Sequence, residues 1–192
     1  MIKGKYIDEK IIKLRKVSLR DQSNYDIIVD KILIRGKWVY FIPCHIFDNK
    51  VTILVPDNFT ELPEKIARIR YISQYRPPVI ITSPNYSENL GYHLLERGTR
   101  NIEQSIEQME ESTLNHAPET IIYDRGSFRS DGLEGRWFDY KNFTVNDETY
   151  NLQFLIYTEH SILAGSFNCR MKFYDEWKEP ILKSFEHITI YR

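Results

Sequence analysis

The stretch HSILAGSFNCRMKFYDEWKEPILKSF, residues 160–185, joins a strand pattern directly to a helix pattern. In its first half, apolar side chains alternate with polar ones, which predicts a strand with one buried face. The apolar set is Leu163, Phe167, Cys169, Met171 and Phe173, and the polar set is Ser166, Asn168, Arg170 and Lys172. In its second half, apolar residues recur at helical spacing, which predicts a helix that packs on the sheet.

The apolar stripe of this closing helix is formed by Trp177, Ile181 and Phe185. Asp175 precedes the stripe and suits the N-cap position, because its carboxylate can accept a backbone N–H. Pro180 removes one backbone donor, so the helix either begins near Glu179 or bends there. Residues 187–191 can then add a final edge strand.

The residues that precede this stretch predict a longer helix and three more strands. A helix is expected over residues 101–117, where Asn101 and Gln104 match a capping box. Its apolar stripe is formed by Ile102, Ile106 and Met109. Strands are expected over residues 120–125, 133–142 and 150–156, with a loop over residues 126–132. Together with the strand that follows residue 160, they predict an antiparallel meander.

The first hundred residues predict shorter elements. Strands are expected over residues 24–34, 38–47, 50–55, 69–72, 79–82 and 90–95, with a helical turn over residues 63–67. Pro43 interrupts the second of these strands, which is typical of an edge strand or a bulge.

These patterns predict an α+β fold, in which helices flank an antiparallel sheet as an α/β/α sandwich with extra N-terminal strands. The 192 residues are expected to form a single domain. Within it, residues 1–45 are expected to form a β extension and residues 46–192 the core.

Composition limits the classes of function. The chain has 26 basic and 27 acidic residues and a net charge of −1, with the signs mixed along its length. This balance argues against a nucleic-acid surface, which usually carries a basic excess. The N-terminus lacks an apolar signal-peptide core, and no stretch reaches the ~20 apolar residues of a membrane span. We therefore expect a cytoplasmic protein without membrane insertion, in which Cys44 and Cys169 are buried thiols.

The sequence lacks the common catalytic signatures. It contains no phosphate-binding GxxxxGK[ST] loop, no GxGxxG, no HExxH, no CxxC and no GxSxG elbow. We therefore predict no catalytic residues, no metal site and no cofactor. The alternative is an enzyme or small-molecule binder whose site is assembled from separated His, Glu and Arg residues. Such a site would be centred on His93 or His160, with Glu88, Glu96 and Glu159 as the nearby carboxylates.

Three arginines form the candidate binding site. Arg125, Arg129 and Arg136 bracket the expected loop over residues 126–132. Guanidinium groups suit carboxylates and phosphates, and exposed hairpin loops often carry recognition residues. We predict that these arginines bind an acidic patch on a partner; an ordinary solvated hairpin with local ion pairs is the alternative.

The order of elements resembles the Mog1/PsbP-like superfamily, with bacterial DcrB-like domain proteins as the nearer comparison. The resemblance covers residues 47–188 and consists of a strand with a proline turn over residues 51–58, the helix over residues 101–117 and the meander. Its more specific marks are AGSF at residues 164–167, Trp177, and ILKSF at residues 181–185. The resemblance implies an α/β/α sandwich and mostly non-enzymatic members that act by binding, including a GTPase-release factor, a photosystem accessory subunit and chaperones of secreted effectors.

The sequence and this resemblance together predict a non-enzymatic cytosolic protein-binding module. Its partner is expected to be another protein, for which it would act as an adaptor or as a chaperone of a secreted or toxic effector. The N-terminal strands could complete the sheet, or they could pair with a second copy of the chain across an exposed edge to form a homodimer.

Overall fold

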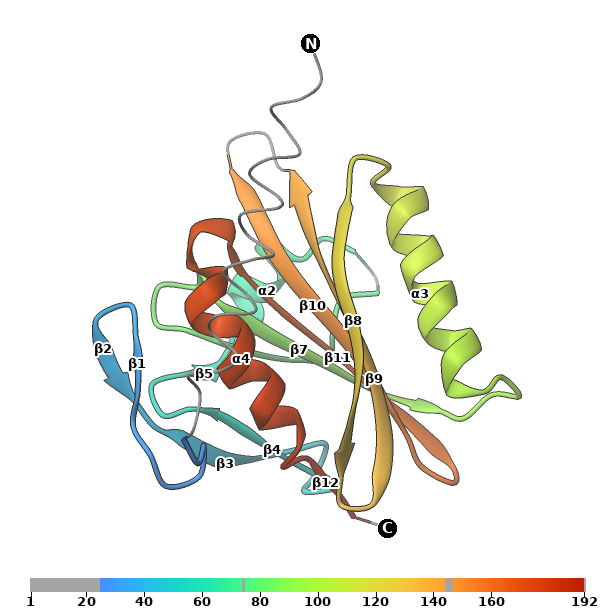
Figure 1. Ribbon diagram of the computed structural model, residues 1–192, viewed down its shortest axis with the longest axis horizontal. Helices are drawn as coiled ribbons and strands as arrows, with labels where there is room; N and C mark the ends of the chain where they lie inside the picture. Colours follow the sequence, from blue (N-terminus) through green and yellow to red (C-terminus); the bar gives the residue numbers. More distant parts are fainter. Residues whose placement is uncertain (1–24, 74, 144–146, 192) are drawn as a thin grey trace.

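The computed structural model describes residues 25–73, 75–143 and 147–191. Its largest element is a seven-stranded antiparallel sheet with strand order β5-β6-β7-β11-β10-β9-β8 (Figure 1). The strands are β5 (Thr60–Glu61), β6 (Val79–Thr82), β7 (Asn89–Glu96), β8 (Ile121–Ser130), β9 (Leu133–Phe143), β10 (Glu148–Tyr157) and β11 (Ser161–Arg170). The last four follow one another in the chain and form the predicted meander.

Glycines in this meander make room for aromatic rings on the neighbouring strand. Gly165 on β11 lies opposite Phe154 on β10, and Gly135 on β9 lies opposite Phe128 on β8. A Cβ atom on Gly165 would approach Phe154 Cε1 to 2.0 Å. The glycine in the AGSF stretch is therefore required by close packing, because the ring occupies the space of a side chain.

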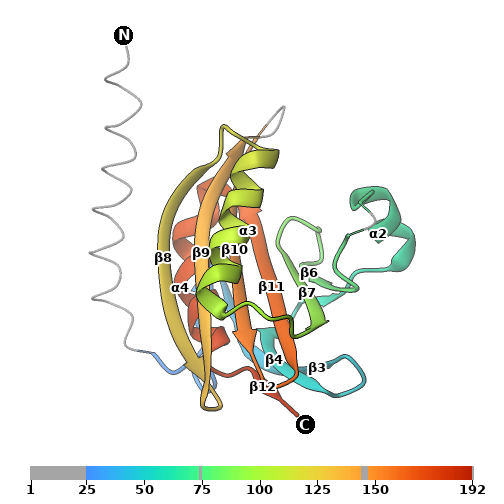
Figure 2. The ribbon, with the colours of Figure 1, turned by 90° about the vertical axis from the view of Figure 1, so that its right-hand side faces the viewer.

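One face of the sheet is covered by α3 (Ile102–His116). This helix begins with the predicted capping box, because Asn101 and Gln104 each accept the other's backbone N–H. Ile102 and Ile106 pack on β9 and β10, in a cluster with Phe138, Tyr140 and Leu155. Figure 2 shows α3 along this face and α4 on the opposite side of the sheet.

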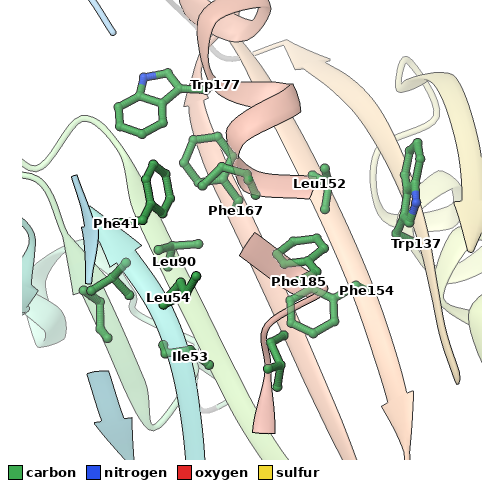
Figure 3. Packing of buried hydrophobic residues seen from close by; sticks show 14 of the residues in the cluster. Phe41, Ile53, Leu54, Leu90, Trp137, Leu152, Phe154, Phe167, Trp177 and Phe185 are labelled. Carbon is green, nitrogen blue, oxygen red and sulfur yellow. The ribbon is translucent and has the colours of Figure 1, made fainter. Parts of the chain in front are cut away.

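The other face is covered by α4 (Tyr174–Phe185) and by a three-stranded sheet with strand order β12-β4-β3. The small sheet consists of β3 (Phe41–Ile46), β4 (Val51–Pro56) and β12 (Thr189–Ile190). Trp177 and Phe185 of α4 point into the main core between the two sheets (Figure 3). Ile27, Ile34, Val39 and Phe41 are also buried in this core.

The predicted α+β sandwich on an antiparallel sheet is confirmed, and the strand expected at residues 187–191 is present as β12. The prediction that Asp175 is the N-cap of the closing helix was wrong. Phe173 is its N-cap and Asp175 lies in its first turn, because η1 (Met171–Phe173) ends β11 early and leads directly into the helix. Pro180 therefore lies inside α4, and a start near Glu179 is also wrong.

The N-terminal part departs further from the prediction. Residues 26–30 form a turn stabilised by the Asp26 carbonyl and carboxylate, so that β1 (Ile32–Ile34) is short. The chain then turns into β2 (Lys37–Val39), which is separated from β3 at Tyr40. The strand expected at residues 69–72 was wrong, because α2 (Glu64–Arg70) extends through Ile69.

The loop expected over residues 126–132 was also wrong. β8 continues to Ser130, and only Asp131 and Gly132 form the turn, with positive φ angles of 50° and 77°. Two central residues with positive φ are the geometry of the tight hairpin turn that an Asp-Gly pair favours.

Candidate functional site

The three predicted arginines lie on strands. Arg125 and Arg129 belong to β8, the edge strand of the large sheet, and Arg136 belongs to β9. Arg125 makes a bidentate ion pair with Glu110 of α3, with Nε–Oε1 and Nη2–Oε2 distances of 2.7 and 2.6 Å. The hydrogen bonds that Arg125 donates to the Glu110 carboxylate raise the pKa of Arg125.

Arg136 makes a second connection between the sheet and α3. Its Nη2 lies 2.8 Å from Glu103 Oε1 on α3, and its Nη1 lies 2.6 Å from Glu134 Oε1 on β9. Among the residues that the structure describes, Arg129 has no ion-pair partner and is exposed. The structure therefore does not bring the three arginines together as one free cationic cluster.

These ion pairs line a groove between α3 and the β8–β9 hairpin, with a volume of about 590 Å³. The groove is lined by Glu103, Ile106, Glu107, Glu110, Arg125, Gly126, Ser127, Arg136 and Trp137. Because acidic and basic side chains already neutralise one another here, an acidic partner would have to displace glutamates. The prediction that these arginines bind a partner remains untested.

A buried ionic cluster lies under α4. Lys178 Nζ is 2.5 Å from Asp139 Oδ2 and 3.4 Å from Asp124 Oδ2, and Tyr150 donates its hydroxyl to Asp139 Oδ2 at 2.8 Å. Burial, followed by the nearby Asp139 carboxylate, raises the pKa of Tyr150 well above its usual value, so the hydroxyl remains a donor. Asp139 is fully buried and Lys178 is 7% exposed. This cluster connects α4 to the sheet.

A small pocket of about 220 Å³ lies between the β1–β2 hairpin and the loop before β7. Arg35 Nη1 lies 2.6 Å from Glu88 Oε1 in this pocket, and its guanidinium stacks 4.0 Å from the centre of the Phe173 ring. Both charged groups are therefore occupied within the protein. The pocket is also smaller than the ~300–1,000 Å³ typical of ligand sites.

In the histidine-centred alternative site, His160 Nε2 lies 3.9 Å from Glu159 Oε2 and both side chains are exposed, whereas Glu88 is not brought to His93. Glu88 is engaged with Arg35, and it lies five residues from His93 along an extended segment, roughly 16 Å at strand spacing. His93 is half-buried, and this burial lowers its pKa. Within residues 25–73, 75–143 and 147–191, no three His, Cys, Asp or Glu side chains are grouped to hold a metal ion.

An exposed apolar surface is the feature that the sequence analysis did not identify. We name it the Trp38 surface. It consists of Ile28, Leu33, Trp38, Tyr40 and Ile42, all of which are exposed. Trp38 is 64% exposed and lies opposite Leu33 across the β1–β2 pair. Tyr40 and Ile42 follow at alternate positions and line a groove of about 590 Å³ together with Ile28.

The strand beneath this surface has an open edge. β3 is the outer strand of the small sheet, so its far side is unpaired among the described residues. Pro43 lies on β3, as predicted for an edge strand, and removes one backbone donor from it. A proline in this position protects the edge against the addition of another strand.

Known structures have the same arrangement of elements, although no protein-family model and no curated protein matches the sequence. The solution structure of cyanobacterial PsbP (CyanoP) from Synechocystis sp. PCC 6803 aligns with a TM-score of 0.59 and 10% identity. The alignment covers 79% of this chain and 92% of CyanoP. The chain has the Mog1/PsbP-like fold.

A second match supports the same fold. LpqN of Mycobacterium tuberculosis, involved in cell envelope biogenesis, aligns with a TM-score of 0.56 and 16% identity, covering 83% of this chain and 95% of LpqN. At these identities, the Mog1/PsbP-like likeness describes architecture only. The nearer resemblance to DcrB-like domains remains a prediction. Among the described residues, none of the helices is both long and apolar enough to cross a membrane.

Proposed function

We propose that this chain is a non-enzymatic, cytoplasmic protein-binding module that contacts another protein through the Trp38 surface. An adaptor, or a chaperone for a secreted or toxic effector, is the role that this proposal favours. The observation that carries it is the exposure of Trp38 and, at alternate positions after it, of Tyr40 and Ile42.

Physical chemistry supports a protein partner for this surface. Tryptophan and tyrosine are enriched among the residues that dominate binding energy at protein interfaces. Burying such side chains removes apolar area from water, which contributes roughly 25 cal/mol per Å². Contiguous exposed apolar patches commonly mark interaction sites, and here the groove beside Tyr40 offers a receptor for a protruding apolar side chain.

The charged side chains of the molecule give less support to a catalytic function. Arg35, Arg125, Arg136 and Lys178 are all engaged in ion pairs with carboxylates of the same chain. A catalytic group needs access to substrate in addition to a suitable pKa. The three predicted arginines remain a secondary contact site in this proposal, with Arg129 as the group that an acidic partner reaches first.

A quantitative pull-down tests the proposal. Full-length wild type, the W38A/Y40A variant and an I72A/Y75A control are immobilised and exposed to native lysate at mild salt, and co-eluting proteins are quantified by mass spectrometry. The control removes two side chains that are also exposed but lie elsewhere. One stoichiometric protein partner, retained by the control and reduced about tenfold or more by W38A/Y40A, is expected. A tenfold loss corresponds to about 1.4 kcal/mol.

Two results would contradict the proposal. Recovery of no specific protein by the wild type removes the partner, and equal recovery by W38A/Y40A removes this surface. Light scattering on the purified proteins tests whether the partner is instead a second copy of the chain. If the wild type is a dimer that W38A/Y40A converts to a monomer, the occupant is a second copy of the chain.

A further inference from the structure

A second exposed apolar group lies on and after α2, well separated in sequence from the Trp38 surface. Ile69, Ile72 and Tyr75 are 78%, 90% and 78% exposed, which makes them the most exposed large apolar side chains among the described residues. Ile69 lies in the last turn of α2, and Ile72 and Tyr75 lie in the segment that follows the helix. In Figure 2, α2 stands at the outer margin of the molecule, away from α3 and α4.

Basic residues lie close to these three residues in the sequence. Residues 64–76 contain four basic residues and one acidic residue, which gives a formal charge of +3, whereas the whole chain has −1. The basic residues are Lys65, Arg68, Arg70 and Arg76. Glu64 is shared by two of them: its Oε1 lies 2.8 Å from Arg68 Nε and 2.5 Å from Arg76 Nη2. Two guanidinium groups therefore share one carboxylate, and the segment keeps its positive excess.

We propose that Ile69, Ile72 and Tyr75, together with the four basic residues named above, dock on a membrane surface that contains anionic lipids. We name this group of residues the α2 surface. Ile69, Ile72 and Tyr75 enter the boundary between headgroups and acyl chains, while the surrounding lysine and arginines contact lipid phosphates. Binding of an interfacial segment to a bilayer strengthens with the apolar area that it buries and with its electrostatic attraction to anionic lipids, and this segment supplies both contributions.

A lipid surface fits these side chains better than a protein does. A specific protein interface buries about 800 Å² on each partner in a shape that matches the receptor. The α2 surface offers three protruding side chains, and none of them lines the grooves or the pocket described above. Lipid adapts to such projections without a shaped counterpart. The docking needs no membrane-spanning segment, because the three side chains reach only the boundary between the lipid headgroups and the acyl chains.

Vesicle co-sedimentation of the full-length chain tests the inference. The probes are vesicles of phosphatidylcholine alone and of an equimolar mixture of phosphatidylcholine and phosphatidylserine. We expect sedimentation with the anionic vesicles only, and a decrease as salt rises, because surface charges are screened within about 8–10 Å at physiological ionic strength.

Matched variants separate the two contributions. I72S/Y75S removes apolar contacts while keeping the charges, and K65Q/R68Q removes charges while keeping the apolar side chains. Each variant is expected to weaken vesicle binding about tenfold or more, because one removes the apolar contribution and the other removes most of the electrostatic contribution. W38A/Y40A is the control and should sediment like the wild type. Because all of these positions are exposed, circular dichroism should show the same fold for every variant.

The inference would be overturned by any of three results. These are no sedimentation of the wild type with anionic vesicles, equal sedimentation with both vesicle types, or wild-type binding by I72S/Y75S. Because the pull-down depends on the Trp38 surface and the vesicle assay on the α2 surface, either proposal can fail while the other holds.

Discussion

Replacing Lys178 with methionine should destabilise the protein by about 3–5 kcal/mol, the range for breaking a buried ion pair from one side. Lys178 is the cation that neutralises Asp139, whose side chain is completely buried. Without it, the Asp139 carboxylate keeps the hydrogen bond from Tyr150 at Oδ2, while Oδ1 has no hydrogen-bond partner among the described residues. Methionine fills a similar volume, so the loss reports the uncompensated charge.

Urea unfolding followed by circular dichroism measures this change through the linear dependence of the unfolding free energy on denaturant. For a chain of this length, each kcal/mol shifts the melting temperature by about 2–4 °C, so a decrease of about 6–20 °C is expected. The matched control is the double variant K178M/D139N, which removes both charges. It should recover more than half of the lost stability, because no buried charge remains without a counterion.

The reasoning would be refuted by a loss of less than about 1 kcal/mol in Lys178→Met, the value of an ordinary exposed ion pair. It would also be refuted if K178M/D139N were no more stable than K178M. In that case the loss would come from packing of the methionine against Trp137, whose ring centre now lies 4.9 Å from Lys178 Nζ.

Three further results are expected. Gly165→Ala should lower the unfolding free energy by about 1–3 kcal/mol in thermal melts, because the added Cβ overlaps the Phe154 ring. Gly98→Ala is the control and should be near neutral, because the space around Gly98 is open. Asn101→Ala should cost about 1 kcal/mol by removing the cap of α3, and Asn101→Ser should restore most of it; equal melting of the two variants would contradict this. Burial lowers the pKa of His93, so the unfolded state binds its proton more tightly, and the stability this residue contributes above about pH 6.5 is lost as pH falls. The wild type should therefore lose more unfolding free energy than His93→Gln between about pH 7.5 and about pH 5.5, and parallel losses would exclude the effect.

The C-terminal half was predictable because its elements are long and their local signals agree. The β11 alternation and the α3 capping box each extend over enough residues for the pattern to identify the element. Short elements give no such repetition. The strand predicted over residues 69–72 has only four residues, and both of its isoleucine side chains are exposed, so no alternation of buried and exposed positions identifies an element there.

The hairpin between β8 and β9 contains a local sequence signal that is sufficient to predict its turn. Asp131-Gly132 is a strong turn pair, and it places Arg125 and Arg129 within β8 instead of in a loop. The partners of Arg125 and Arg136 could not be predicted. Glu110 and Glu103 meet them only because α3 packs across β9 and β10, a tertiary contact without a local sequence signal.

Exposure of Trp38 could not be predicted for a related reason. Tryptophan in a strand is usually buried, and only the packing of β1 and β2 on the core through Ile34 and Val39 decides that the opposite face meets water. The fold does not need an apolar residue on that face, nor one at Ile72. Exposed apolar side chains contribute little to folding, so W38A/Y40A and I72S/Y75S should keep the wild-type unfolding free energy to within about 0.5 kcal/mol. Loss of partner or lipid binding in these variants would then report the surfaces themselves, whereas Lys178→Met would change both folding and binding together.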